Sequence, residues 1–228
     1  MNTLSQIISF LKYPNNENQK KSQKEKLILF SKLTLFHFAG VFVLIILLAI
    51  LISVLNSYGI KIENKTNTDN LFSTYGKYSL LIAAVIAPII EECVFRLPLS
   101  FSKRDIILSF FILTSVIGYK IMGNNMYLIC LVISFSLILY GISQVSQDKL
   151  DKFKKRKGII VFYIYTISFV LVHLTNFIDF QLNLLPVYIL LMTPVILLSV
   201  NLAFCRMRIG FGYAILLHCL VNASTILI

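Results

Sequence analysis

Residues 33–55 have the sequence LTLFHFAGVFVLIILLAILISVL, an apolar stretch without a single Asp, Glu, Lys or Arg. About 20 such residues in an α-helix cross the roughly 30 Å hydrocarbon layer of a bilayer. Inside that layer no water satisfies the peptide groups, and a helix satisfies them within one segment. The stretch therefore predicts a transmembrane helix.

Similar apolar runs follow along the chain, and we expect spans near residues 33–55, 78–97, 106–122, 126–146, 158–177, 184–204 and 209–228. The composition agrees, because 57% of the 228 residues are hydrophobic and only 14% are charged, which is outside the range of soluble domains. The runs are continuously apolar rather than alternating, which favours helices over a β-barrel. The predicted fold is an all-α, polytopic transmembrane bundle of about seven spans.

The N-terminal part of the chain has a different character. Residues 1–11 carry apolar side chains at roughly helical spacing, and a polar and basic stretch follows through Lys32. This pattern predicts an interfacial helix lying on the membrane surface, and a disordered tail is the alternative. We divide the chain into a basic cytoplasmic segment, 1–32, and a transmembrane bundle, 33–228. We expect no cleaved signal peptide, because the first long apolar run is long enough to span and lacks a small-residue cleavage site after it.

The net charge of +11 is distributed in a way that indicates a membrane rather than nucleic acid as the partner. Sixteen of the 21 basic residues lie in segments 12–32, 103–104, 149–157 and 206–208, whereas the outer segments hold only Lys61, Lys65, Lys77 and Lys120, and Arg96 falls inside the second span. The positive-inside rule then predicts a cytoplasmic N-terminus and an external C-terminus, in the plasma membrane. The basic run 152–157 is expected to lie on anionic lipid headgroups.

Ionisable residues within spans are candidate functional residues, because each costs about 2.5–3.5 kcal/mol at a helix centre on insertion scales. We set aside His37, Asp105 and Lys120, which fall at expected span ends. The remaining ionisable residues lie in three segments, which are EECVFR at 91–96, FVLVH at 169–173 and HCLVN at 218–222. The candidates are therefore Glu91, Glu92, Arg96, His173 and His218.

Residues four apart share one face of a helix. This spacing pairs Glu92 with Arg96, Phe169 with His173, and His218 with Asn222. Glu91 points about 100° away from its neighbour and has no such partner, which leaves it available as a general base.

These residue types fit hydrolysis of a peptide bond in two ways. A carboxylate can activate water while the histidines and the asparagine stabilise the oxyanion. Alternatively, His173, His218 and Glu91 form a reasonable ligand set for Zn²⁺, which would activate bound water and polarise the carbonyl. The sequence leaves both mechanisms open.

The patterns E-E-x-x-x-R, F-x-x-x-H and H-x-x-x-N, in this order on membrane helices, resemble the motifs of the CPBP family of intramembrane proteases. That family includes CAAX prenyl proteases, bacteriocin-processing proteins and Abi proteins linked to bacteriocin immunity. The resemblance covers about residues 78–228. It implies that Glu91 activates water and that Glu92 with Arg96 supports it. It also implies that His173, His218 and Asn222 complete the catalytic centre, with Phe169 beside it.

The expected function is that of an intramembrane endopeptidase acting on a membrane-associated protein or peptide, whether prenylated or not. One alternative is a non-catalytic bacteriocin-immunity or membrane-interaction protein with the same fold. Another is a proton-coupled transporter, because intramembrane carboxylates and histidines also form proton relays. On the expected boundaries, Glu91 lies toward the cytoplasmic end of its helix and His173 toward the outer end of an oppositely directed one.

Overall fold

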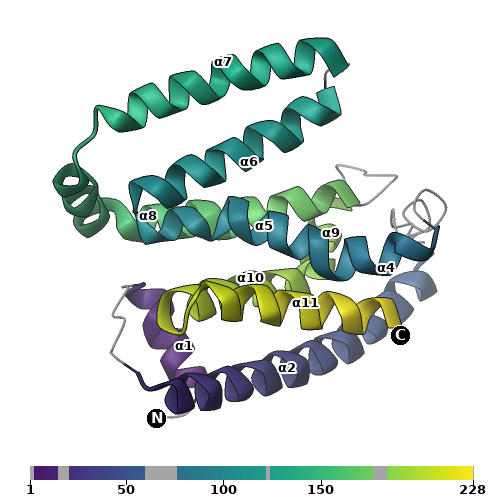
Figure 1. Ribbon diagram of the computed structural model, residues 1–228. Helices are drawn as coiled ribbons and strands as arrows, with labels where there is room; N and C mark the ends of the chain where they lie inside the picture. The colour runs from purple at the N-terminus through teal and green to yellow at the C-terminus, as the bar shows by residue number, and fades with distance from the viewer. Residues whose placement is uncertain (1–2, 15–20, 60–75, 122–123, 177–183, 228) are drawn as a thin grey trace.

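The computed structural model describes residues 3–14, 21–59, 76–121, 124–176 and 184–227, and within these ranges the chain is helical and contains no β-strand (Figure 1). The α-helices are α1 (Thr3–Lys12), α2 (Gln23–Ser57), α4 (Ser79–Leu81), α5 (Ala87–Phe95), α6 (Lys103–Ile121), α7 (Asn124–Ser143), α8 (Gln147–His173), α9 (Leu185–Leu191), α10 (Thr193–Arg208) and α11 (Phe211–Leu227). The shorter turns are η1 (Gly76–Tyr78), the π-helix η2 (Ile82–Ile86), η3 (Leu97–Ser100) and η4 (Leu174–Asn176). The predicted all-α class is confirmed for this part of the chain.

Several helices are long and apolar enough to cross a membrane. They are α2, the continuous run Gly76–Phe95 and α8, and α9 with α10 makes a fourth if this pair, bent by 51°, is one broken span. Three or four spans are thus supported over the described ranges, fewer than the seven expected. Two of the remaining helices are less typical of membrane spans. Helix α6 begins with three charged residues at 103–105. Helix α11 has 17 residues, fewer than the roughly 20 of a perpendicular span.

Two helices begin well before the apolar runs that predicted them. The first, α2, starts at Gln23, where Ser22 and Glu25 form a capping box: the Ser22 hydroxyl accepts from the Glu25 amide, and the Glu25 carboxylate accepts from the Ser22 amide. The second, α8, starts at Gln147 behind the cap residue Ser146, so the basic run 152–157 is part of a helix. Lys, Glu and Gln are good helix formers, so a prediction from hydropathy alone placed the start of both helices too late in the sequence. The outer segment with Lys61 and Lys65 lies outside the described residues.

The N-terminal segment forms the helix α1, in agreement with the expected helix rather than a disordered tail, and this helix packs on the bundle. Its residues Ile7 and Phe10 are buried, and the Phe10 ring makes edge contacts with Phe162 and Phe204 at centroid distances of 5.3 and 5.2 Å. An amphipathic helix buries its apolar face against any apolar surface that fits. Here Phe162 of α8 and Phe204 of α10 provide that surface.

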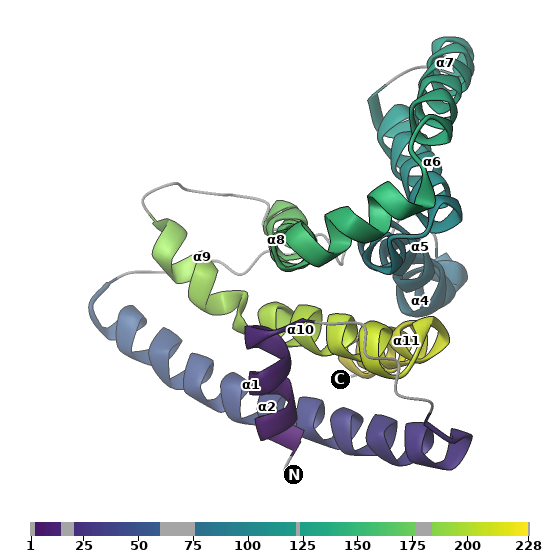
Figure 2. The ribbon, with the colours of Figure 1, turned by 90° about the vertical axis from the view of Figure 1, so that its left-hand side faces the viewer.

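The centre of the bundle is α10, which contacts α2, α8 and α11, while α5 lies between α6 and α11. In Figures 1 and 2 the α6–α7 hairpin stands apart from the group formed by α1, α2, α10 and α11. A Cβ at Gly40 of α2 would lie 2.8 Å from Leu197 of α10, so a glycine permits this close approach. The outer face of α2 exposes Leu35 and Phe42, as expected of a helix that meets lipid.

Candidate active site

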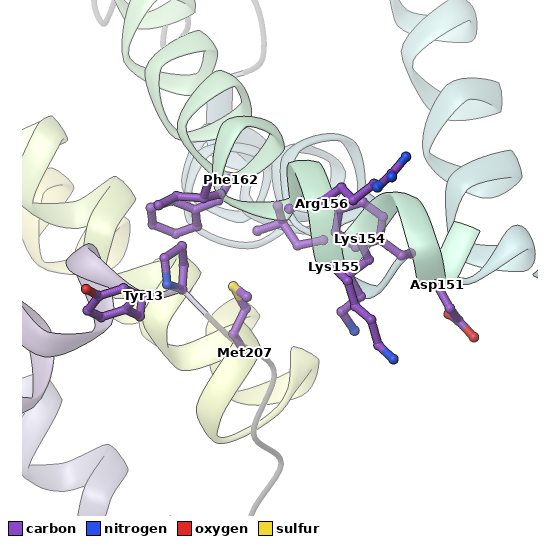
Figure 3. Close-up of a pocket in the computed structure, with 12 residues that line it drawn as sticks. Tyr13, Asp151, Lys154, Lys155, Arg156, Phe162 and Met207 are labelled. Carbon is purple, nitrogen blue, oxygen red and sulfur yellow. The ribbon is translucent and has the colours of Figure 1, made fainter. Parts of the chain in front are cut away.

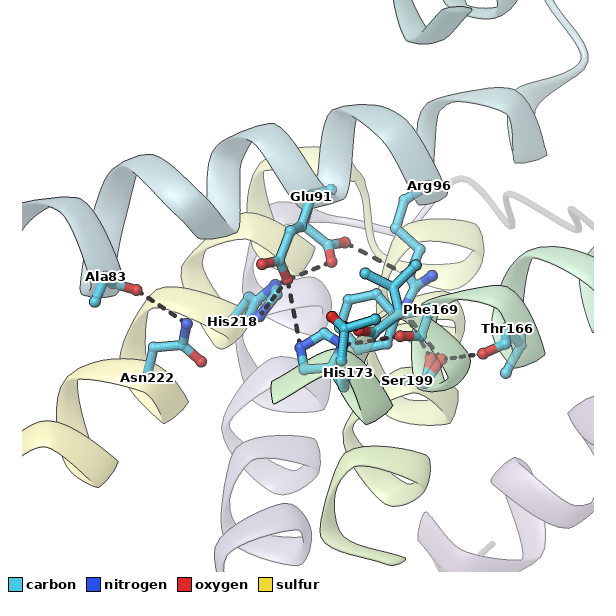
Figure 4. A network of polar contacts seen from close by, with 12 residues as sticks. Ala83, Glu91, Arg96, Thr166, Phe169, His173, Ser199, His218 and Asn222 are labelled. Carbon is cyan, nitrogen blue, oxygen red and sulfur yellow. Dashed lines mark hydrogen bonds and ion pairs between the residues drawn. The ribbon is translucent and has the colours of Figure 1, made fainter. Parts of the chain in front are cut away.

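The three motif segments meet where α5, α8 and α11 come together (Figure 4). The carboxylate of Glu91 lies between two imidazoles: its Oε2 atom is 3.7 Å from Nε2 of His173 and 3.6 Å from Nε2 of His218. The structure therefore brings together three residues from helices more than 40 positions apart in sequence.

Glu91 and His173 lie side by side, although the expected helix boundaries placed them at different depths. The path of the chain after α5 explains this difference. This helix stops at Phe95, and the buried turn η3 continues the chain toward Phe101. Phe101 contacts Lys154 near the start of α8, whereas Arg96 is linked through Ser199 to Thr166 of the same helix. The two contact points are separated by about 18 Å of helix. Glu91 accordingly lies beside the C-terminal end of α8, where His173 is located.

His218 is held by the second glutamate. Its Nδ1 atom lies 3.1 Å from Oε1 of Glu92, and both side chains are almost fully buried. An ionised carboxylate only accepts hydrogen bonds, so Nδ1 donates. In the neutral imidazole this leaves Nε2, the atom that faces Glu91, with a lone pair.

His173 is oriented in the same sense by the backbone. Its Nδ1 atom lies 2.8 Å from the carbonyl oxygen of Phe169, one turn earlier in α8. A carbonyl only accepts, so Nδ1 donates here as well, and Nε2 faces Glu91 with its lone pair. The ring of Phe169 packs against this imidazole at a centroid distance of 4.5 Å and against that of His218 at 5.7 Å.

When both imidazoles are neutral, three acceptor atoms face one another, and no described residue donates a hydrogen bond to the Oε2 atom of Glu91. The Oε2 atom of Glu91 is buried and has no hydrogen-bond partner, which is costly unless a water, a proton or a cation lies beside it. Two imidazole nitrogens and a carboxylate oxygen, with each Nδ1 held by an oxygen, are also the donor types and outer contacts of a zinc site. Across the described ranges, however, no three His, Cys, Asp or Glu side chains are already arranged around one metal position.

Arg96 lies behind Glu92 and is completely buried. Its Nε atom is 3.7 Å from Oε2 of Glu92, the pair expected from their spacing. Its Nη2 atom donates to the hydroxyl of Ser199 at 3.2 Å, and its guanidinium lies 4.6 Å from the centre of the Phe169 ring. This arrangement makes Glu92 and Arg96 a supporting pair beneath the two imidazoles.

Asn222 has a different partner from the one expected. Its amide donates to the carbonyl oxygen of Ala83 at 3.0 Å, in the π-helix η2. A π-helical turn displaces carbonyls from the regular ladder, and Asn222 satisfies one of them. The side chain of Asn222 thus connects α11 to η2 by a hydrogen bond, and it lies next to the histidines in Figure 4.

Sequence reasoning did not single out several other buried polar residues, among them Ser199, Asn201 and His37. The hydroxyl of Ser199 links Arg96 to the carbonyl of Thr166. The amide nitrogen of Asn201 lies 3.2 Å from Nδ1 of His37. Ser, Thr and Asn are common in membrane helices, so they gave no distinct signal. His37 was set aside as a residue of a span end, but the early start of α2 places it inside the bundle.

The arrangement defines a class of protein, a helical bundle with membrane-length helices and a cluster of two histidines, two glutamates and an arginine, of which Glu92, Arg96 and His218 are buried. No family model matches the chain, and searches of curated proteins and of solved structures find no significant match. The assignment to a family is consequently a proposal that rests on the motifs and on the geometry of the cluster.

Proposed function

We propose that this protein is an intramembrane endopeptidase of the CPBP type. The observation that carries the proposal is the unpartnered Oε2 atom of Glu91 between the Nε2 atoms of His173 and His218. A carboxylate oxygen that lacks a donor and faces two imidazoles is suited to hold and deprotonate a water molecule.

In the proposed reaction, Glu91 takes a proton from the water whose oxygen attacks the scissile carbonyl carbon. The proton passes from Glu91 to the nitrogen of the leaving amine when the peptide bond breaks. His173 or His218, protonated on both nitrogens, donates from Nε2 to the carbonyl oxygen as it gains negative charge. The ion pair of Glu92 with Arg96 holds the His218 ring in place for this step.

Zn²⁺ is the alternative source of activation. The donor types of His173, His218 and Glu91 are those that Zn²⁺ prefers, and the ion would supply Lewis acidity and a more acidic bound water. In that case these three residues bind the metal.

The proposal includes the membrane arrangement. We propose about seven spans, in which α6, α7 and α11 cross the bilayer in addition to the longer helices, with 19, 20 and 17 residues. The distribution of Lys and Arg supports a cytoplasmic N-terminus and an external C-terminus, in the plasma membrane. The substrate is a membrane-associated protein or peptide, because the site lies within apolar helices.

The test is a comparison of the purified parent chain with a Glu91→Ala variant in detergent. Both proteins are analysed for bound metal and incubated with a library of internally quenched peptides, and an Asp148→Ala variant, which loses an exposed carboxylate on α8, serves as the control. The proposal expects cleavage by the parent and the control only. Full cleavage by Glu91→Ala would refute it. If the chain protects cells from a bacteriocin and Glu91→Ala protects equally, the non-catalytic immunity protein is favoured instead.

A further inference from the structure

A cavity of about 610 Å³ lies between α8, α10, η3 and the residues that follow α1, and the Glu91 cluster is not part of its lining. Leu99, Phe101, Phe162 and Met207 form apolar walls, and Lys154 and Lys155 line it from α8. Figure 3 shows Tyr13 and Phe162 on one side of the cavity and the two lysines on the other. The cavity thus combines an apolar surface with cationic groups.

The charge of the cavity is positive. Lys154, Lys155 and Arg156 line it together with a single acidic residue, Asp151, whose carboxylate already accepts a hydrogen bond from Gln147 at 3.1 Å. Lys154 is half-buried, and its ammonium lies 5.8 Å from the centre of the Phe101 ring. An anion is therefore the complementary ligand.

The position of the cavity along α8 defines where an occupant would lie. Residues of α8 before Gly158 are rich in charge, whereas residues 158–172 include no Asp, Glu, Lys, Arg or His. The cavity includes Gly158 and Ile159 and therefore lies at this change. In a membrane helix such a change marks the boundary between headgroups and hydrocarbon.

We propose that this cavity is a binding site for an anionic phospholipid. The phosphate of the headgroup binds Lys154 and Lys155, and the start of an acyl chain packs against Leu99, Phe162 and Met207. Basic pockets between membrane helices on the cytoplasmic side suit such headgroups. A soluble phosphate would make the polar contacts but leave the apolar walls empty, so the two-part lining selects a lipid.

The site differs from the general attraction of a basic segment to an anionic leaflet. General attraction depends on the number of charges and treats all lysines of the run alike. A cavity makes Lys154 and Lys155 special, because Lys149 and Lys152 of the same helix do not line it. Two double variants with the same change in charge therefore separate the two explanations.

A bound lipid is expected to stabilise the fold, because it would join α8, α10 and the chain after α1. The last turn of α1, just before this segment, is already held to α8 by a hydrogen bond from the hydroxyl of Tyr163 to the carbonyl of Leu11 at 2.7 Å. A ligand that binds only the folded state raises the midpoint of thermal unfolding. At a concentration 100 times the dissociation constant, the rise for a chain of this size is about 5 °C or more.

The experiment measures the unfolding midpoint of the full chain in a neutral detergent, with added phosphatidylglycerol, phosphatidylcholine or inorganic phosphate. We expect phosphatidylglycerol alone to raise the midpoint of the parent and of the control Lys149→Gln/Lys152→Gln, and the rise to be lost in Lys154→Gln/Lys155→Gln. Equal loss in both double variants, or an equal rise with phosphatidylcholine, would overturn the proposal. An equal rise with inorganic phosphate would show a phosphate site rather than a lipid site.

A second measurement needs no variant. Native mass spectrometry of the parent in an equimolar mixture of the two lipids should show one retained phosphatidylglycerol molecule per chain in preference to phosphatidylcholine. Equal retention of both lipids would refute the site even if the lysine variants fail to fold. Neither measurement depends on protease activity.

Discussion

The Nδ1 atom of His218 lies 3.1 Å from Oε1 of Glu92, and this contact between two buried side chains gives the adjacent glutamates different tasks. It turns the opposite nitrogen of the ring toward Glu91, at 3.6 Å from Oε2. Glu92 also pairs with Arg96, whereas Glu91 faces the two imidazoles. The predictions below follow from this division.

The Glu91→Gln substitution should abolish cleavage while leaving the fold intact. Gln has nearly the same shape but takes no proton from water, so we expect activity to fall by at least about 100-fold. The side chain of Glu91 is 30% exposed, which allows an amide there at little cost. Cleavage rates and unfolding midpoints are compared at matched protein amounts, and full activity in the variant would show that Glu91 is not the base.

The Glu92→Gln substitution should lower stability and activity together. It leaves Arg96 buried without its anion, and breaking a buried pair in this way costs about 3–5 kcal/mol. It also weakens the contact that orients His218. Thermal unfolding and folding yield measure the first effect, and the cleavage rate measures the second. If Glu92→Gln proves as stable as the parent but inactive, our assignment of the two glutamates is reversed.

The two histidines should act as one unit, because both Nε2 atoms face the same oxygen of Glu91. We expect His173→Gln and His218→Gln each to remove most of the activity, and the double variant to lose little more than either single one. The measurement is kcat/KM for the three variants and the parent. Losses that multiply would show that the histidines contribute independently.

The Ser199→Ala substitution should destabilise the bundle although Ser199 contacts no reacting group. Its hydroxyl accepts from Arg96 and donates to the carbonyl of Thr166, and both bonds are buried. Leaving such groups unsatisfied costs about 1–3 kcal/mol. The matched control is Ser143→Ala, because the exposed Ser143 bonds locally, to the carbonyl of Tyr140 and from the side-chain amide of Gln144, and we expect a change within about 0.5 kcal/mol there. Equal effects of the two substitutions on thermal unfolding would contradict the network.

Topology reporters should show the N-terminus and the junction before α8 in the cytoplasm and the C-terminus outside. Residues 150–157 belong to the helix Gln147–His173, so an inserted tag fits better at 144–146. Protease protection in sealed vesicles reads out each position. A cytoplasmic C-terminus together with a cytoplasmic N-terminus would mean an even number of spans and would contradict the proposed topology.

The sequence by itself determined the helical class and the short set of candidate residues. Residues 33–55 predict a membrane-length helix because transfer into hydrocarbon depends on each residue's own side chain, and they lie within α2. Glu91, His173 and His218 could be singled out because ionisable groups are rare in apolar runs. The ion pair of Glu92 with Arg96 followed from one turn of helix.

Only the tertiary structure decided how these residues are paired across helices. His218 could face either glutamate, and Asn222 could face the site or a backbone carbonyl, until the rotation and depth of α5 and α11 were known. Likewise, the packing of α5 on α8 brought Glu91 next to His173. Such contacts join residues as many as 139 positions apart. Their free energy depends on packing between whole helices, which no local pattern of residues specifies.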